Sequence, residues 1–522
     1  MMITAKNHKK HLPGKMTVKG IMLILFLLPA FSCSRDYITY EEFGAAGDGR
    51  HDDMEAIVAA HDAANAKGLP VKAKDGATYY ISNRLLTASI RTDTDWGRAR
   101  FIIDDSDIEV SEDTDNIEAP VFKVESALPP YEVTGLEGGL LKGQASLGVK
   151  LPCRSLVRLV NDTRRVYIRK GENQNNGVPQ QEMLVADADG NIEESSAIIW
   201  DYDRITKATA WPVDTARLTV RGGIFTTIAN QAPSKYNYFI RGIDVRRSNV
   251  LVEGVTHYVT GELEEHGAPY YAFLWVREAA DVTVKDCLLT PHQTYWTTGS
   301  AGIPSRMGSY DLGANSSVNV RWENCRQTID IDNPSYWGLF TSNHCKNLQM
   351  ERCSISRFDA HMGVENVSLK DCTFGHMGMR CVGFGRLYME NCEVHTRTFI
   401  LLRDDYGASW DGEVVLKDCT HKPFFGNPIT IIDGANNGDH DFGYTCSLPS
   451  SLEFHNLLVD DICCEATDKV FIFGSFNRDA KAPGLQPYPA KGTILMDNVR
   501  CSSGKTIELS PNPGLFSGYV LL

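Results

Sequence analysis

Three short stretches of the sequence combine arginine, aspartate and aromatic residues. They are Arg306-Met-Gly-Ser-Tyr-Asp311, Arg357-Phe-Asp-Ala-His361 and Arg403-Asp-Asp-Tyr406. Guanidinium groups hold anions, histidine and tyrosine exchange protons, and carboxylates serve as acid, base or nucleophile. We therefore predict a catalytic set that consists of Tyr310, Asp311, Arg357, Asp359, His361, Arg403, Asp405 and Tyr406.

A second group of residues offers contacts for a sugar. Aromatic rings present flat apolar surfaces with polar edges, and histidine or lysine reaches polar groups. The substrate-binding candidates are His266, Tyr270, Trp337, Lys346 and Trp410. Neither group requires a cofactor, and no protein metal site is predicted, although a calcium ion is an alternative means of neutralising an acidic substrate.

A repeated phrase indicates which elements position these residues. It reads polar, apolar, polar, apolar, charged, polar, cysteine, and this alternation predicts a strand with one buried face. Six copies end at Cys287, Cys325, Cys353, Cys372, Cys392 and Cys419. The gaps contain glycine, asparagine, aspartate and serine, and none contains the long amphipathic segment of a helical crossover.

Strands that recur in one phase with short turns between them are typical of a parallel β-helix, a solenoid in which each repeat is one coil. The six cysteines are then expected to form a column of buried free thiols, which we favour over a disulfide framework. The 522 residues would suggest three or four domains at about 150 residues each, but the repeat makes a single solenoid the better prediction.

The cysteines also give a register for the predicted catalytic residues. Asp311, Asp359 and Asp405 each lie 13 or 14 residues before a phrase cysteine. We therefore expect these carboxylates in one column, on alternate coils and about 10 Å apart.

Composition limits the classes of partner. The chain is 43% hydrophobic and 23% charged, which excludes global disorder. Its net charge of −14 argues against binding nucleic acid through phosphates. An anionic polysaccharide remains compatible, because local arginines decide the potential of a cleft.

Residues 1–32 predict a leader. Lysines precede a short apolar stretch from Ile21 to Ala30, too short for a membrane span of about 20 residues. The end of this stretch, Pro29-Ala-Phe-Ser-Cys33, resembles a bacterial lipobox. The resemblance implies export and lipidation at Cys33, with the lipid as the only membrane contact; a plain signal cleaved near Ser32 is the alternative.

Residues 37–85 carry a further motif. Glu42-Phe-Gly-Ala-Ala-Gly-Asp-Gly-Arg-His-Asp-Asp53 precedes an amphipathic helix that ends at Gly68. This arrangement resembles the N-terminal cap of the pectate-lyase-like superfamily, which includes polysaccharide lyases, rhamnogalacturonases and tailspike depolymerases. The resemblance implies a right-handed β-helix over residues 86–522 and a carbohydrate substrate. Asp52 and Asp53 look like a catalytic pair, but a turn and a helix cap are the favoured interpretation.

The repeat is lost between residues 153 and 216. Polar, turn-forming clusters alternate there with apolar strands, which predicts a β-hairpin insertion in the solenoid. We expect this insertion to form a wall of the binding cleft.

Two chemistries and a binding role remain open. In a lyase that cleaves a uronic-acid polymer, Arg357 and Arg403 would neutralise the carboxylate, His361 would act as base, and Tyr310 or Tyr406 as acid. A glycoside hydrolase needs two carboxyls about 5–9.5 Å apart, and the predicted column spacing lies at or beyond this range. The ordered motifs of the polygalacturonase branch are also absent. We therefore predict a lyase, with a hydrolase or a non-catalytic glycan-binding solenoid as alternatives.

Overall fold

The computed structural model describes residues 36–82, 84–108, 117–171, 174–232, 238–263, 267–298, 304–338, 340–424, 428–463, 469–476 and 490–522. The predicted leader, its Cys33 and the candidate His266 lie outside these residues. The body described below runs from Tyr37 to Leu522. In the part of the chain that is described, no helix has the length and apolar character needed to cross a membrane.

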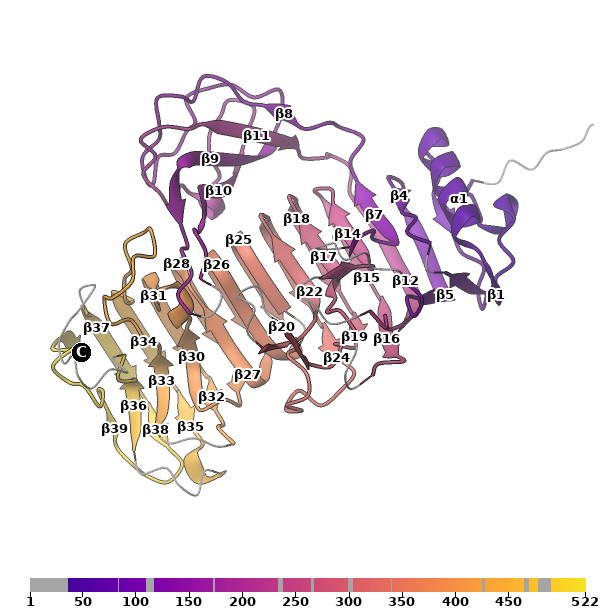
Figure 1. Cartoon of the computed structure of the whole chain (residues 1–522). Helices are drawn as coiled ribbons and strands as arrows, with labels where there is room; N and C mark the ends of the chain where they lie inside the picture. The colour runs from indigo at the N-terminus through magenta and orange to yellow at the C-terminus, as the bar shows by residue number, and fades with distance from the viewer. Residues whose placement is uncertain are drawn as a thin grey trace, which may run out of the picture. The chain divides into compact units, whose positions relative to one another are not determined.

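Most of the described strands form one large parallel sheet wound into a solenoid, as predicted from the repeat (Figure 1). The first face is formed by the strands that carry the repeated phrase: β2 (Val71–Lys72), β5 (Thr94–Asp104), β12 (Leu218–Ile228), β15 (Val250–Glu253), β18 (Ala280–Lys285), β23 (Val318–Glu323), β25 (Phe340–Glu351), β26 (Ser354–Lys370), β28 (Gly383–Glu390), β31 (Trp410–Lys417), β34 (Ser451–His455), β37 (Lys491–Asp497) and β40 (Gly518–Leu521).

The second face follows the phrase. It consists of β1 (Asp48–Asp52), β3 (Thr78–Ile81), β16 (Thr256–Thr260), β19 (Leu288–Leu289), β24 (Arg326–Gln327), β27 (Thr373–Cys381), β29 (Glu393–Val394), β32 (Thr420–His421), β35 (Leu458–Val459) and β38 (Arg500–Cys501), together with parts of β5, β12 and β26.

The third face carries most of the chemistry discussed below. Its strands are β4 (Ala88–Ile90), β7 (Phe122–Glu125), β14 (Ile243–Arg246), β17 (Tyr271–Arg277), β22 (Tyr310–Asn315), β30 (Thr398–Leu402), β33 (Ile429–Asp433), β36 (Val470–Phe473) and β39 (Ile507–Glu508), joined by parts of β25, β26 and β27. Two small pairs lie outside the solenoid sheet: β6 (Ile117–Glu118) with β13 (Phe239–Ile240), and β20 (Tyr295–Thr298) with β21 (Pro304–Met307).

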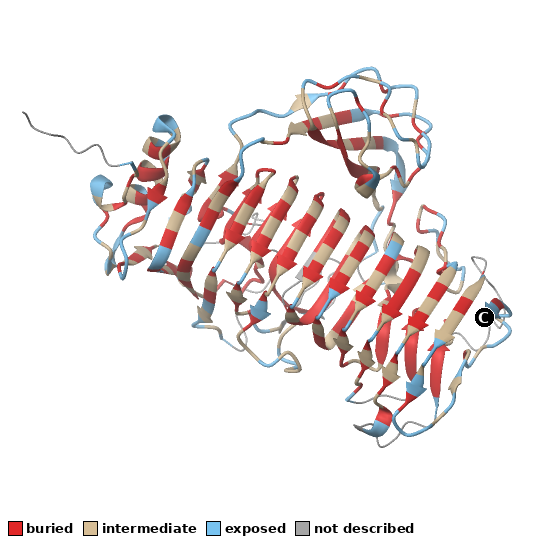
Figure 2. Ribbon diagram, turned by 180° about the vertical axis from the view of Figure 1, so that it is seen from behind, coloured by how far each residue is buried: buried red, intermediate tan, exposed pale blue. Residues whose placement is uncertain are grey.

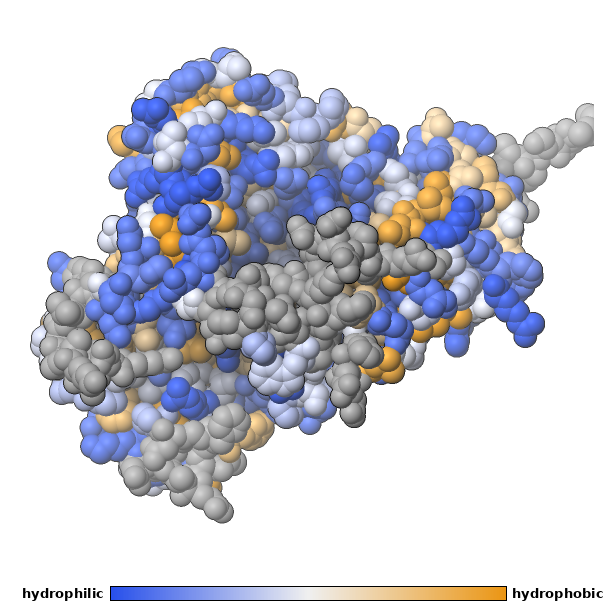
Figure 3. Space-filling model, viewed as in Figure 1, coloured by the Kyte–Doolittle hydropathy of each residue, from blue (hydrophilic) through white to orange (hydrophobic). Residues whose placement is uncertain are grey.

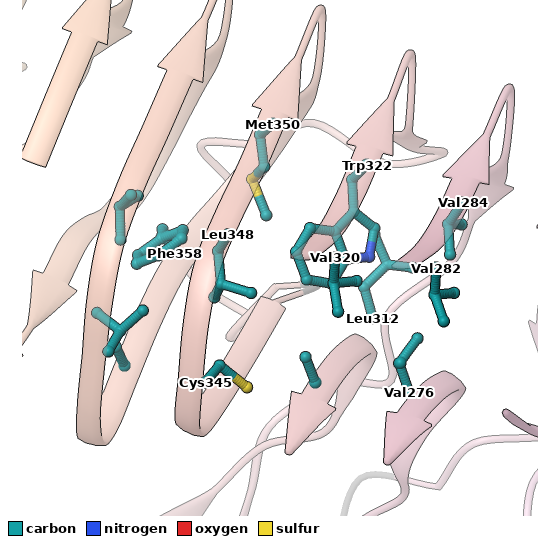
Figure 4. Close-up of a cluster of buried hydrophobic side chains, with 14 of the residues drawn as sticks. Val276, Val282, Val284, Leu312, Val320, Trp322, Cys345, Leu348, Met350 and Phe358 are labelled. Atoms are coloured by element: carbon teal, nitrogen blue, oxygen red, sulfur yellow. The ribbon is translucent and has the colours of Figure 1, made fainter. Parts of the chain in front are cut away.

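The core follows from the alternation of the phrase. On β18 and β23 buried and half-buried residues alternate, and Figure 2 shows this pattern along the strands. Val282, Val320 and Leu348 occupy equivalent positions on successive coils and point into the same apolar interior (Figure 4). The cysteine column is confirmed, since all six phrase cysteines are buried free thiols.

The polar ends of the phrase have a backbone role. Asn319 (φ 56°), Asn324 (φ 51°) and Asn347 (φ 53°) are left-handed, a conformation that asparagine tolerates better than most residues. Their side chains also bond from coil to coil, for example Asn347 Nδ2 to Asn319 Oδ1 at 2.7 Å. The phrase therefore encodes both turns that flank a strand.

The helix α1 (Met54–Lys67) ends at the left-handed Gly68, as predicted. Its buried residues, including Met54 and Ile57, belong to the solenoid core. Asp53 makes no helix-capping bond; its carboxylate instead accepts from the Ala46 amide at 2.6 Å and thereby holds the preceding turn. A structural role for Asp53, rather than a catalytic one, fits this contact. Short 3-10 helices lie at η1 (Glu41–Phe43), η2 (Glu194–Ser196), η3 (Asp404–Tyr406) and η4 (Asp461–Cys463).

The insertion is larger than the predicted hairpin. A four-stranded antiparallel sheet has the order β10 (Val178–Ala186), β9 (Ser155–Val166), β11 (Lys207–Pro212) and β8 (Tyr131–Glu132). The strand β8 precedes the predicted boundary at residue 153 because two residues give no detectable alternation. Figure 1 shows this sheet standing off the solenoid, and Figure 3 shows the surface hollowed beneath it, with mainly hydrophilic residues around.

The insertion returns to the solenoid at a tight contact. A Cβ at Gly363 of β26 would meet the hydroxyl of Tyr167 at 2.1 Å, so only glycine admits this tyrosine. Nearby, Lys346 donates to Glu182 of β10 at 2.5 Å and also faces Glu365 at 3.2 Å. These contacts hold the end of the insertion beside β26.

Candidate functional site

The predicted catalytic residues of β26 point away from the core. Phe358 and Ala360 are core residues, so strand alternation turns Arg357, Asp359 and His361 outward. The strand β30 runs two coils further along the same face, and its C-terminal end leads directly into Arg403 and η3. We call Arg357, Asp359, His361, Arg403 and Asp405 the arginine–carboxylate cluster.

Asp359 is the centre of this cluster. It is fully buried, and its carboxylate accepts from Arg403 Nη1 at 2.9 and 3.0 Å. The carboxylate also accepts a hydrogen bond from His361 Nε2 at 2.8 Å and forms an ion pair with Arg357. Two guanidinium groups therefore share one buried negative charge.

Asp405 binds two guanidinium groups, one from its near neighbour Arg403 and one from the distant Arg169. Arg403 Nη2 lies 2.7 Å and Arg169 Nε 2.8 Å from its Oδ2. Although burial favours the neutral acid, Arg403 and Arg169 hold the pKa of Asp405 below its usual value. This carboxylate is therefore ionised at neutral pH.

Arg357 is buried but only partly satisfied. Its guanidinium lies 5.4 Å from the ring centroid of Tyr310 and 5.2 Å from that of Trp337. Among the described residues, Nε and Nη1 have no hydrogen-bond partner. Burial, reinforced by the nearby Arg380 and Arg403, lowers the pKa of Arg357 to about 9. At neutral pH Arg357 is therefore still a cation, and two of its N–H groups are buried without an acceptor among the described residues.

His361 is the most exposed member of the cluster on β26, with 24% of its side chain accessible. Burial lowers its pKa well below the usual 6.5, and Arg403 and Arg357 lower it further. The imidazole is therefore neutral at pH 7. Because Nε2 donates its proton to Asp359, the lone pair on Nδ1 is left as a proton acceptor.

The structure places Asp311 elsewhere. Its Oδ2 lies 3.0 Å from Nδ1 of His257, and both side chains are 1% exposed. The neighbouring Tyr310 does reach the cluster, with its ring 6.3 Å from that of His361. The predicted column of three carboxylates is therefore wrong. Two coils beyond Asp359 the residue in register is Leu401, four residues before Asp405, although Asp359 and Asp405 are joined through Arg403.

Three of the predicted substrate-binding residues are structural. Tyr270 is 6% exposed and donates to Asp105 at 3.1 Å. Trp410 is fully buried and donates its Nε1 proton to Gly385 O at 3.0 Å. Lys346 is 2% exposed and holds Glu182. Buried groups that are already paired cannot stack on or bind a sugar, and these assignments are corrected. Trp337 remains in the site, beside Arg357.

Two site residues were missed from the sequence. Arg169 comes from the insertion, 236 residues before its partner Asp405. Arg380 pairs in register with Asp359 and is near Arg403. Arg169 lies in a stretch that was interpreted as a polar turn, and only its neighbour Tyr167, an aromatic residue in that turn, marks the segment as one that packs.

The site offers no clear protein metal centre. Within the described ranges, no group of three or more histidine, cysteine, aspartate or glutamate side chains is arranged to hold a metal ion. Both cluster carboxylates already bind guanidinium groups.

Comparisons with known proteins assign no family to this chain. No protein-family profile and no curated protein matches the sequence. The tailspike Gp54 of Acinetobacter baumannii bacteriophage AP22, solved with a capsular saccharide, is 9% identical, with 93% of this chain and 79% of that chain covered and a TM-score of 0.47. The tailspike gp49 of Pseudomonas phage LKA1 is 12% identical, with 93% and 84% covered and a TM-score of 0.46. An exopolygalacturonase from Thermotoga maritima is 11% identical, with 91% and 92% covered and a TM-score of 0.34. At these identities and TM-scores the likeness assigns no role to this chain.

Proposed function

We propose that this protein is a polysaccharide lyase that cleaves a uronic-acid-containing chain by β-elimination. The observation that carries the proposal is the pairing of a neutral His361 with a buried Arg357 that has two unpartnered N–H groups. The first is a proton acceptor and the second an anion receptor, and β-elimination from a uronate needs both.

The residues divide the reaction as follows. Arg357 binds the uronate carboxylate and stabilises the charge that develops on it when the α-proton leaves. Nδ1 of His361 takes the C5 proton, the electron pair forms the C4–C5 double bond, and the C4–O bond breaks. The leaving oxygen takes a proton from the phenol of Tyr310, whose ring adjoins both His361 and Arg357. Arg403 and Asp359 orient His361.

A hydrolytic mechanism receives less support from the same groups. A glycosidase needs one carboxylic acid that is protonated at working pH. The pKa of Asp405 is instead lowered by its guanidinium partners, despite its burial. Asp359 is fully buried and bonded to two arginines and a histidine, so it has no free face for a sugar.

Incubation with a panel of uronic-acid polysaccharides tests the proposal. A lyase yields an unsaturated product with ultraviolet absorbance, whereas a hydrolase yields reducing ends without it. Replacing His361 by glutamine is expected to lower kcat by about 10²–10⁴-fold, since it removes the base but keeps a polar side chain. Arg98→Gln is the matched control, because Arg98 is exposed and pairs with the exposed Asp75. Full activity of His361→Gln would exclude this site, and glycan binding without any product would favour a binding solenoid.

Export with a lipid anchor at Cys33 is part of the proposal. The lysine-rich start, the short apolar stretch and the lipobox-like end support it. Metabolic labelling with a radioactive fatty acid is expected to mark the wild type and not Cys33→Ser. Equal labelling of the two proteins would remove the anchor from the proposal.

A further inference from the structure

Arg380 differs from the other arginines of the candidate site. Arg169, Arg357 and Arg403 each form an ion pair with a carboxylate of the cluster. Within the described part of the chain, Arg380 forms no ion pair with a carboxylate, and its side chain makes one hydrogen bond, from Nε to Met377 O at 3.2 Å. No direct contact of this kind therefore balances its charge.

Strand alternation places Arg380 on the outer surface of β27, beside Asp359. Met379 and Cys381 are core residues, so the residue between them turns outward. Arg380 lies in register with Asp359 on the coil before it and with Leu401 on the coil after it, and neighbouring coils are about 4.8 Å apart. A carboxylate thus stands next to Arg380 in the sheet and is nevertheless bonded by other arginines.

The bond to the backbone fixes the direction of the Arg380 side chain. Because Nε donates to Met377 O, the two terminal nitrogens are left for another acceptor. Arg380 is half-buried, whereas the side chain of Arg357 is only 4% exposed, so a ligand reaches Arg380 more easily. A guanidinium that is already oriented loses less entropy when it binds an anion.

The surroundings of Arg380 favour a bound anion. Burial and the nearby Arg403 lower its pKa, whereas Tyr310 and the carboxylates of η3 oppose this change. Arg380 in turn reinforces the effect of burial on the pKa of Arg357, as expected for two guanidinium groups that lie close together. A carboxylate placed between them would relieve their repulsion, and it has enough lone pairs to accept from both.

We propose that Arg380 is the second arm of the anion receptor, and that it selects an acidic sugar over its neutral counterpart. The inference rests on the proposed function, in which Arg357 receives the uronate carboxylate. Arg380 binds the same carboxylate from the side that faces solvent. Since water screens this side, Arg380 contributes mainly to the affinity for the substrate, whereas His361 contributes to kcat.

Arg380→Gln tests this role with two ligands that differ in charge, tetragalacturonate and its neutral, carboxyl-reduced form. Calorimetric titration into the His361→Gln variant, with and without Arg380→Gln, measures affinity without turnover. Loss of the guanidinium is expected to weaken binding of tetragalacturonate about 10–100-fold and to leave binding of the neutral form unchanged. No change with tetragalacturonate, or an equal change with both ligands, would overturn the role of Arg380.

Two further variants separate recognition from structure and from net charge. Arg380→Lys keeps the charge without the planar fork and is expected to recover part of the lost affinity. Arg386 of β28 is 54% exposed and pairs with Glu413, so Arg386→Gln is expected to bind tetragalacturonate as its parent does. If Arg386→Gln loses as much affinity as Arg380→Gln, net charge explains the effect and the assignment of Arg380 is wrong.

Kinetics separate the receptor from the reaction. In the otherwise unchanged protein, Arg380→Gln is expected to raise KM on polygalacturonate about 10–100-fold with kcat unchanged. If Arg380→Gln abolishes the preference for the charged ligand but the wild type gives no unsaturated product, the receptor stands and the lyase falls. Unsaturated product together with an unchanged preference in Arg380→Gln supports the lyase and refutes the role of Arg380. A wild type that neither binds nor cleaves the charged ligand contradicts both.

Discussion

At the scale of single residues, Asp359 determines how the cluster is charged. Its carboxylate is shared by Arg357 and Arg403, so it does little to stabilise a proton on His361. The imidazole is buried in a cationic neighbourhood. Burial, reinforced by Arg403 and Arg357, is why a histidine bonded to an aspartate nevertheless has a lowered pKa.

The pH dependence of activity follows from this state. His361 acts as a base only when neutral, so activity is present above its folded pKa and lost as pH falls through it. Since that pKa is well below 6.5, the acidic limb of kcat/KM is expected below pH 6.5. Arg169→Gln is expected to move this limb upward, because Arg169 contributes to lowering the pKa of His361. A limb above pH 6.5 in the wild type would contradict the assignment.

Lys346 provides a second residue-scale prediction. Lys346→Met removes the cation between the buried Glu182 and Glu365, and is expected to lower the free energy of unfolding by about 3–5 kcal/mol. Lys142→Met is the control: Lys142 is 55% exposed and its partner Asp411 41%, so about 0–1 kcal/mol is expected. Urea unfolding measures both. Because Lys346 is structural, kcat/KM of the folded Lys346→Met variant is expected to be unchanged. A large loss of kcat/KM would show that Lys346 does bind the substrate.

At the scale of elements, the ends of the phrase strands fix the turns. Asn347 combines a left-handed backbone with a bond to the coil before it. Alanine lacks both advantages, whereas glycine adopts the backbone without strain.

Asn347→Ala is therefore expected to destabilise the protein by about 1–2 kcal/mol, and Asn347→Gly by roughly 1 kcal/mol less than that. Denaturant unfolding of the two variants measures the difference. If the two variants lose the same free energy of unfolding, tolerance of the left-handed backbone is not what asparagine contributes at this position.

The same elements show how much could be predicted from sequence. The phrase predicted the strands and the cysteine column because alternation and a left-handed asparagine are local features. The sequence also grouped Arg357, Asp359 and His361 in one candidate set, and the structure places all three on one face of β26. The predicted position of Asp311 was wrong because counting back from a cysteine assumes coils of equal length. Bulges shift the register between Tyr271 and Leu274 and again after Ile355.

The insertion could not be predicted in the same way. Its site residue Arg169 meets Asp405 across 236 residues, and no local pattern reports such a contact. The start of the insertion, placed at residue 153 from the sequence, misses β8 (Tyr131–Glu132) for a related reason. This two-residue strand is recognisable by its pairing with β11 and not by its own sequence.

At the scale of the whole molecule, the interior contains a buried aspartate–histidine pair, with His292 and Glu262 as its charged neighbours. Asp311 of β22 bonds to His257 of β16, and His257 bonds in turn to Thr227 of β12. Burial raises the pKa of Asp311 to about 8. This pair links three strands from different coils, so its protonation bears on the stability of the solenoid.

Asp311→Asn tests this link. The folded pKa of about 8 exceeds the unfolded value of about 3.9, so the contribution of Asp311 to stability is complete in acid and is lost as pH rises toward 8. Asparagine stays neutral, and the Tm of the variant relative to wild type is expected to increase between pH 5 and pH 9. Asp75→Asn is the control, since Asp75 is exposed and its pKa is lowered by Arg98. A constant Tm difference would mean that Asp311 is ionised in the fold.

The cysteine column has a consequence for how the chain reaches its fold. Cys325 contacts Cys287 and Cys353, and Cys372 contacts Cys353 and Cys392. Neighbouring coils are about 4.8 Å apart, within the separation of about 4.4–6.8 Å that a disulfide spans. In the folded state the thiols are shielded from oxidants by burial. During synthesis they are not, and an oxidising compartment would crosslink coils before their register is set. Under the proposed export, faster closure of each coil over its thiol would therefore raise the yield of native protein.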